Sequence, residues 1–115
     1  MLKYKVLFYT EGGKNPLEEF LNSLPKQAKE KTWTRIELLE EKGNQMSTQY
    51  CEKLTGSPLW ELKIKSRNSA YRIFYFFSGK LIILVHGFIK KTEKTPRGDI
   101  QLAERRRNEW LGREK

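Results

Sequence analysis

Residues 59–91, LWELKIKSRNSAYRIFYFFSGKLIILVHGFIKK, hold three strand patterns in close succession and therefore decide the fold. The first seven of them alternate between the two faces of a strand, and the apolar face carries Trp60, Leu62 and Ile64. Residues 70–77 are apolar on both faces except at Arg72, and residues 80–86 are apolar almost throughout, which is typical of central strands. Ser78-Gly79 predicts a tight hairpin between them.

Helical patterns dominate the first half of the chain. Residues 4–9 predict a strand, and Asn15-Pro16 predicts the start of a short helix that ends near Leu24. Residues 26–42 predict a longer helix that Gly43-Asn44 ends. Its apolar stripe has members at helical spacing, namely Ala28, Thr32, Ile36 and Leu39, widened by Trp33.

The remaining segments complete a single domain over residues 1–115. Residues 45–58 are polar and predict turns, and Thr95-Pro96 predicts the start of a last helix. The resulting order is β-α-α-β-β-β-α. Two adjacent helices must bury their stripes on one sheet face, so we expect an α+β fold in which a small, antiparallel-rich sheet packs on a helical hairpin. The other face is free unless the last helix or a partner covers it.

Charge is concentrated in the second half of the chain. The 115 residues include 23 Lys+Arg and 14 Asp+Glu, for a net charge of +9. Residues 1–58 contribute +1 (nine cations, eight anions) and residues 59–115 contribute +8 (fourteen cations, six anions). Because these charges interleave with strand residues, we expect a folded basic surface whose partner is a polyanion, nucleic acid first.

Several classes of protein and site are excluded. The longest aliphatic run, residues 81–85, is far shorter than the about 18–20 residues that cross a bilayer, so we expect no membrane partner. The one cysteine, Cys51, excludes an internal disulfide and fits a reducing cytoplasm, where we expect the protein to act. His86 has no second ligand at zinc spacing, and a single aspartate, Asp99, does not build a two-metal centre. We therefore expect no metal and no other cofactor.

The charged face of the three strands is the candidate site. It carries Lys63 and Lys65, then Arg72, then His86, and Lys90 follows. Cations beside aromatic rings suit a single-stranded polynucleotide, and His86, whose type titrates near neutrality, suits acid–base work. The structural alternatives are an ion pair between Arg72 and Glu61, a solvated face for the lysines, and a strand-end role for His86.

Specific motifs match one family. The segment His86-Gly87-Phe88-Ile89-Lys90-Lys91-Thr92-Glu93-Lys94-Thr95-Pro96, followed by Asp99-Ile100, Ala103 and Arg106, resembles the signature hGFxKKTxKTPxxEIxxAxxR of phage-derived, HigB-like toxins of the RelE/ParE superfamily. Residues 59–63 with Tyr71-Arg72-Ile73 resemble the strand pair LWELR…YRv of that family. Asn15-Pro16-Leu17 is similar to the family's helix opening NPvxeFl.

The resemblance implies a RelE-like fold and a toxin from a two-gene toxin–antitoxin module. Such enzymes cut mRNA on the ribosome without metal, through attack of a 2′-hydroxyl on the adjacent phosphate. It implies a helix-turn-helix antitoxin as inhibitory partner, through which the complex binds operator DNA. It also implies phosphate stabilisation by Arg72 and catalytic roles for Lys63, Lys65, His86 and Lys90, with His86 the first choice for proton transfer and a lysine the second.

Further cations are expected to bind RNA. These are Lys91 and Lys94 in the loop after the last strand, and Arg105, Arg106 and Arg107 in the final helix. Residues 90–92 alternatively form only a turn, and the arginines alternatively form only a solvated helix end whose charges suit the helix dipole. A second hypothesis for the whole protein is a ParE-like toxin that binds and poisons DNA gyrase without cleaving nucleic acid. Such a protein needs no phosphate site, so Arg72 and the lysines favour RNA cleavage.

Overall fold

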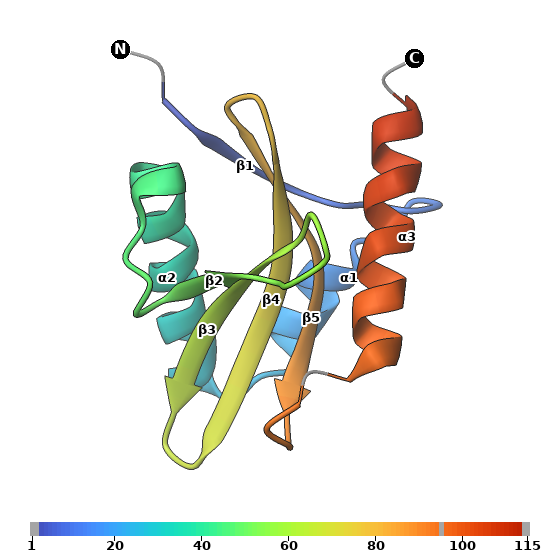
Figure 1. The fold of residues 1–115 in the computed structure, drawn as a ribbon. Coiled ribbons are helices and arrows are strands. Elements are labelled where there is room, and N and C mark those ends of the chain that lie inside the picture. Colours follow the sequence, from blue (N-terminus) through green and yellow to red (C-terminus); the bar gives the residue numbers. More distant parts are fainter. Residues whose placement is uncertain (1–2, 95, 114–115) are drawn as a thin grey trace.

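The computed structural model describes residues 3–94 and 96–113 and has the α+β fold that the sequence predicts (Figure 1). Its elements are β1 (Lys5–Phe8), α1 (Pro16–Asn22), α2 (Lys26–Lys42), a 3-10 turn (Gly43–Gln45), β2 (Cys51–Lys53), β3 (Trp60–Ser66), β4 (Ser69–Ser78), β5 (Leu81–Lys90) and α3 (Arg97–Arg113). The strands form one sheet in the order β1-β5-β4-β3-β2. Neighbouring strands are antiparallel except β1 and β5, which run parallel.

Local signals set the ends of the first two helices. The Asn15 side chain caps α1 by accepting a hydrogen bond from the Glu18 N–H at 3.0 Å. The sequence predicts the bounds of α2 correctly. Gly43 follows α2 with a φ of +55°, and a Cβ there would lie 2.1 Å from the Tyr4 ring, so only glycine fits. Within the described residues, no helix is long and apolar enough to cross a membrane.

The helical hairpin covers one face of the sheet. The predicted stripe of α2 is buried, and it packs with Leu17 and Leu21 of α1. The strands supply alternate side chains to this core, including Leu62, Ile64, Ile73, Tyr75, Ile82 and Leu84. Trp33 departs from the predicted stripe: it is 40% exposed and stacks on Phe8 of β1, with ring centroids 5.7 Å apart.

The last helix covers part of the other face. α3 packs on β4 and β5, while β3 and β2 lie to the left of it in Figure 1. Ala103 is fully buried there in a cluster with Phe74, Phe76 and Val85. Trp110 meets Phe76 edge-on at 5.8 Å. On this face the side chains under α3 therefore belong to the core, and the part that α3 does not cover is open surface.

Two strands differ from the prediction. β2 lies within the segment expected to form turns, where it pairs with β3 at the edge of the sheet. Its three residues are too few and too polar to show a pattern. The last strand does not end at His86 but continues through Gly87 to Lys90. Gly87 is required because Phe20 of α1 lies where a Cβ would be, at 2.4 Å.

A β-bulge decides which way the end of β5 faces. Tyr75 pairs with Leu84 but Phe74 pairs with His86, so Val85 is an extra residue in β5. Val85 and His86 therefore both face α3, and every later side chain of the strand changes face. In this way Lys90 comes to lie on the same face as Arg72.

Candidate nucleic-acid interface

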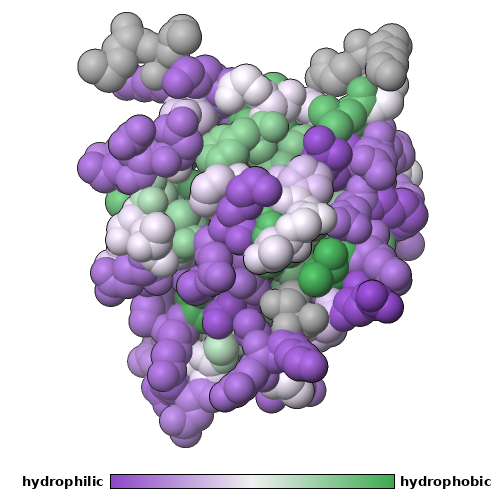
Figure 2. All heavy atoms as spheres, in the orientation of Figure 1, coloured by the Kyte–Doolittle hydropathy of each residue, from purple (hydrophilic) through white to green (hydrophobic). Residues whose placement is uncertain are grey.

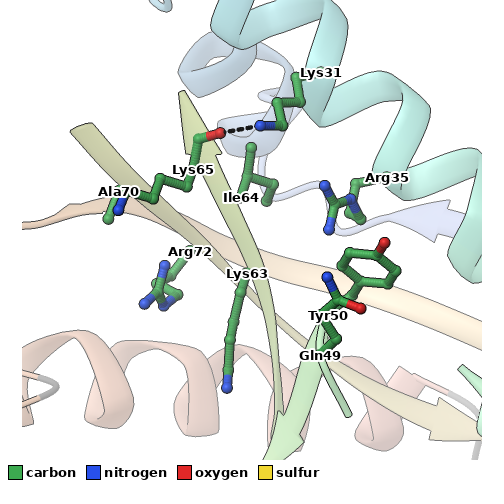
Figure 3. A pocket seen from close by; sticks show the side chains of 9 residues that line it. All are labelled: Lys31, Arg35, Gln49, Tyr50, Lys63, Ile64, Lys65, Ala70 and Arg72. Atoms are coloured by element: carbon green, nitrogen blue, oxygen red, sulfur yellow. Dashed lines mark hydrogen bonds between the residues drawn. The ribbon is translucent and has the colours of Figure 1, made fainter. Parts of the chain in front are cut away.

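A hollow with a mainly cationic lining passes around the edge of β3, from α2 on one face of the sheet to the side chains of β3 and β4 on the other face (Figure 3). Its volume is about 360 Å³. The lining consists of Lys31, Arg35, Gln49, Tyr50, Lys63, Ile64, Lys65, Ala70 and Arg72. Five of these nine residues are Lys or Arg and none is acidic, so we name it the basic cleft.

Strand register brings the predicted cations together. Lys63 is the cross-strand partner of Arg72. Ala70 pairs with Lys65 on one side and Lys90 on the other, and its small side chain leaves space between the two lysines. The prediction that these four cations share one face of the sheet is confirmed.

A second hollow adjoins the basic cleft on the β5 side. It has a volume of about 480 Å³ and is lined by Ala70, Arg72, Lys90, Lys91, Thr92 and Glu93. We name it the β5 hollow. Arg72 and Ala70 border both hollows, so Arg72 stands in the wall that they share. A strand of linked phosphates lying across both would pass Arg72.

Arg72 is also part of a largely buried ion pair. Its Nε lies 3.5 Å from Glu61 Oε2, and the two side chains are 16% and 5% exposed. Its Nη1 donates a hydrogen bond to the Tyr71 carbonyl at 3.2 Å. The ion pair with Glu61, which the sequence offers as the structural explanation of Arg72, is therefore present, and it holds the guanidinium at the border of both hollows.

The positive charges of this site lower the pKa of a carboxylate at its edge. Glu52 of β2 accepts a hydrogen bond from Lys63 Nζ at 2.9 Å. This hydrogen bond and the Lys63 charge hold the pKa of Glu52 below its usual value, and the charges of Lys90 and Arg72 lower it further. The site thus stabilises a negative charge on an oxygen atom, as a phosphate would require.

The part of the cleft that α2 and the chain before β2 supply is not predicted by the sequence. Lys31 donates a hydrogen bond to the Lys65 carbonyl, and the Arg35 Cζ lies 3.9 Å from the centre of the Tyr50 ring. One signal for Lys31 and Arg35 is available, because like charges four residues apart cost a helix about 0.2–0.5 kcal/mol. Nothing in the sequence assigns Tyr50 or Glu52 to the site.

His86 shares the face of Arg72 but does not line either hollow. Its Nε2 lies 2.5 Å from Asp99 Oδ1 in the first turn of α3, and its ring stacks on Phe88. The side chain is only 14% exposed. Burial lowers the pKa of His86, and the contact with Asp99 opposes that effect. In this structure His86 joins β5 to α3.

The other predicted RNA contacts fall into two groups. Lys91 lines the β5 hollow, and Lys94 is exposed in the following loop, where its carbonyl accepts a hydrogen bond from Thr92. Part of the signature, Thr95, lies outside the described residues.

The three arginines of α3 that are expected to bind RNA contact other parts of the protein. Arg106 donates a hydrogen bond to the Val85 carbonyl at 2.8 Å, and its guanidinium lies near the Tyr9 ring. Arg105 lies 3.6 Å from Glu11, and Arg107 lies over the Phe76 ring. None of the three lines the basic cleft or the β5 hollow.

The space-filling view also separates a polar part of the surface from an apolar part. In Figure 2 hydrophilic side chains gather over the lower ends of β3, β4 and β5, and apolar ones gather towards the opposite end of the sheet. Among the described residues, no three His, Cys, Asp or Glu side chains cluster as metal ligands would.

Comparison with known proteins identifies the family. No curated protein matches the chain. The model of the family "Phage derived protein Gp49-like (DUF891)" matches residues 19–108, from α1 through both hollows into α3. This family is phage-derived and RelE-like, of the toxin type. Because the match takes in most of the chain, the protein belongs to the Gp49-like family.

Proposed function

We propose that this protein is the toxin of a type II toxin–antitoxin pair, of the HigB-like branch, and that it cleaves mRNA on the ribosome. The observation that carries the proposal is the position of Arg72 in the wall between two hollows that cations line. Membership of a RelE-like, toxin-type family supports it.

The two hollows suit a single-stranded RNA backbone. Lys63 and Lys65 lie on one side of Arg72 and Lys90 on the other, so successive phosphates would each meet a cation. Each neutralised phosphate releases counterions, which makes such binding strongly dependent on salt. A protein that only poisons gyrase needs no such row of cations.

Cleavage requires stabilisation of charge and transfer of protons. The 2′-oxygen of one ribose bonds to the adjacent phosphorus while the bond from phosphorus to the next 5′-oxygen breaks. The 2′-hydroxyl proton passes to a base, and the departing 5′-oxygen receives a proton, which leaves a 2′,3′-cyclic phosphate and a 5′-hydroxyl. We assign the extra charge on the phosphorane to Arg72, with the flanking lysines Lys63, Lys65 and Lys90 in support.

The sequence offers two candidates for the side chain that transfers protons. Asp99 contacts Nε2 of His86, so Nδ1 is the nitrogen left for proton transfer, and His86 serves only if it reaches a hollow that it does not line in this structure. A lysine of the cleft is the other candidate. Replacement of His86 by Gln, which keeps a donor for Asp99, lowers the cleavage rate about 10²–10⁴-fold if His86 transfers the proton.

The test is the integrity of a defined mRNA on stalled ribosomes. Wild-type protein is expected to cut at the A-site codon and to leave naked mRNA intact. Lys63→Gln should slow cutting at least about tenfold, since it removes a charge beside the phosphate. Lys80→Gln is the matched control, because Lys80 is exposed in the turn at the opposite end of β4 and lies over Tyr4 instead.

The outcomes separate the two hypotheses. Cuts that depend on Lys63 and not on Lys80 support the endonuclease. Intact message with folded protein would refute it and direct attention to gyrase supercoiling. A helix-turn-helix antitoxin bound to operator DNA is the partner that we propose, and co-expression with the neighbouring reading frame should suppress the growth arrest.

A further inference from the structure

A third hollow lies beside the basic cleft and shares Tyr50 with it. It is lined by Leu38 and Lys42 of α2 and by Gln45, Met46, Ser47 and Tyr50 of the following segment. Its volume is about 330 Å³. We name it the Tyr50 groove. It has one cation where the basic cleft has five, so the two neighbouring hollows differ in chemistry.

The lining of the Tyr50 groove suits a flat ring with polar edges. Leu38, Met46 and the Tyr50 ring supply apolar contact. Gln45 and Ser47 are exposed at its rim, where an amide and a hydroxyl offer both donors and acceptors. An aromatic face with a few polar groups is the surface on which proteins stack the bases of single-stranded nucleic acid.

Tyr50 is held in place before any ligand arrives. Figure 3 shows the Arg35 guanidinium over its ring, and the Cζ atom lies 3.9 Å from the ring centre. The Tyr50 carbonyl accepts a hydrogen bond from the Lys63 N–H at 2.8 Å. These contacts tie the wall of the groove to the strand that carries the phosphate-binding lysines. A preordered ring loses little entropy when a base stacks on it.

We infer that the Tyr50 groove is a nucleobase subsite for a nucleotide of the RNA strand whose phosphates lie in the basic cleft. This inference rests on the proposed function and extends it. It makes Tyr50 and Gln45 determinants of which nucleotide is accepted next to the phosphate at Arg72. Gln45 reads the edge of the base and Tyr50 supports its face.

The first experiment needs no variant. Amide chemical shifts of the wild-type protein are followed by NMR during titration with ribose 5-phosphate and with adenosine 5′-monophosphate. Both ligands should shift signals of the basic cleft, such as those of Lys63 and Arg72. Only the nucleotide should also shift the amides of Gln45, Ser47 and Tyr50.

The second experiment measures the gain that the base provides. Binding of an oligoadenylate octanucleotide is compared with that of the same backbone without bases, by fluorescence anisotropy. Wild-type protein should prefer the strand with bases about 5- to 150-fold, the range for stacking on one aromatic side chain. Tyr50→Ala should remove most of this preference, and Tyr50→Phe should keep it. Trp33→Ala is the matched control, because Trp33 is an exposed aromatic of α2 that lines neither hollow.

Failure of the subsite and failure of the proposed function give different results. If both ligands shift only the basic cleft, or if Tyr50→Ala keeps the full preference for bases, the Tyr50 groove is not a base subsite while the phosphate site stands. If neither ligand shifts any cleft residue and the octanucleotide does not bind even at low salt, the phosphate site itself is refuted, and the inference falls with it.

Discussion

Replacement of Arg72 is expected to damage the fold as well as the site. Glu61 is 4% exposed, and in Arg72→Ala its carboxylate loses its ion-pair partner in a largely dry environment. Breaking a buried pair in this way costs about 3–5 kcal/mol. We expect the lower end, about 3 kcal/mol, because Arg72 is 16% exposed and the two atoms are 3.5 Å apart. For a domain of this size that lowers the Tm by about 12 °C.

A double variant separates stability from function. Glu61→Leu with Arg72→Met removes both charges while it keeps similar side-chain volume, and such replacements are neutral or stabilising. We therefore expect its unfolding free energy to lie within about 1 kcal/mol of the wild-type value or above it. The double variant should nevertheless fail to cleave RNA, because the phosphate has lost Arg72.

The assay is urea and thermal denaturation followed by circular dichroism, on wild type, Arg72→Ala and the double variant. An Arg72→Ala protein that melts with the wild type would refute the buried-pair argument, and so would a double variant as unstable as the single one. Loss of cleavage in Arg72→Ala alone carries no weight for catalysis until this comparison is made.

Three other predictions follow from packing and charge. Gly87→Ala should lower the unfolding free energy by about 1–3 kcal/mol, because its Cβ would lie 2.4 Å from Phe20. Gly112→Ala, in open space on α3, should instead raise the unfolding free energy by up to about 1 kcal/mol. If both variants lost the same stability in urea denaturation, close packing at Gly87 would not be the cause. Burial lowers the pKa of His86 below its unfolded value of about 6.5, so the unfolded protein binds a proton more readily than the folded protein, and the free energy of unfolding falls as the pH drops below that value. The difference in unfolding free energy between wild type and His86→Gln should therefore change as the pH drops below about 6.5. A difference that stays constant over this pH range would contradict the prediction. Glu52→Gln removes a negative charge 2.9 Å from Lys63 and should tighten RNA binding about two- to fivefold at low salt, so weaker binding would show that the carboxylate contributes to the site.

The elements with strong local signals could be predicted from the sequence. Asn15-Pro16 and Gly43 mark the ends of helices through their own backbone chemistry, and the alternation around Trp60 identifies β3 with its two faces. β2 could not be predicted, because its hydrogen bonds come from β3 and not from a preference of Cys51–Lys53 for strand geometry. The bulge at Val85 likewise depends on how β5 fits both β4 and α3.

The candidate site likewise contains residues that the sequence predicts and residues that it does not. Lys63, Lys65 and Arg72 could be predicted to lie together because neighbouring strands carry them on one face. Lys31 and Arg35 reach the basic cleft only through the docking of α2 on the sheet, and Tyr50 only through the pairing of its segment with β3, neither of which a local pattern describes. His86 is a candidate from the sequence as its single histidine, whereas its short contact with Asp99 depends on the path of the chain into α3.

The parallel pairing of β1 with β5 has a consequence for the order of synthesis. Lys5 of β1 pairs with Leu81, and Phe8 with Leu84. During synthesis β1 must therefore wait for β5, the last of the five strands, since β5 is its only neighbour in the sheet among the residues that the structure describes. Contacts between such distant segments form late in folding. A nascent chain that ends before β5 has neither the Lys90 side of the candidate site nor a closed sheet, so during translation this site is complete only after β5 has been made.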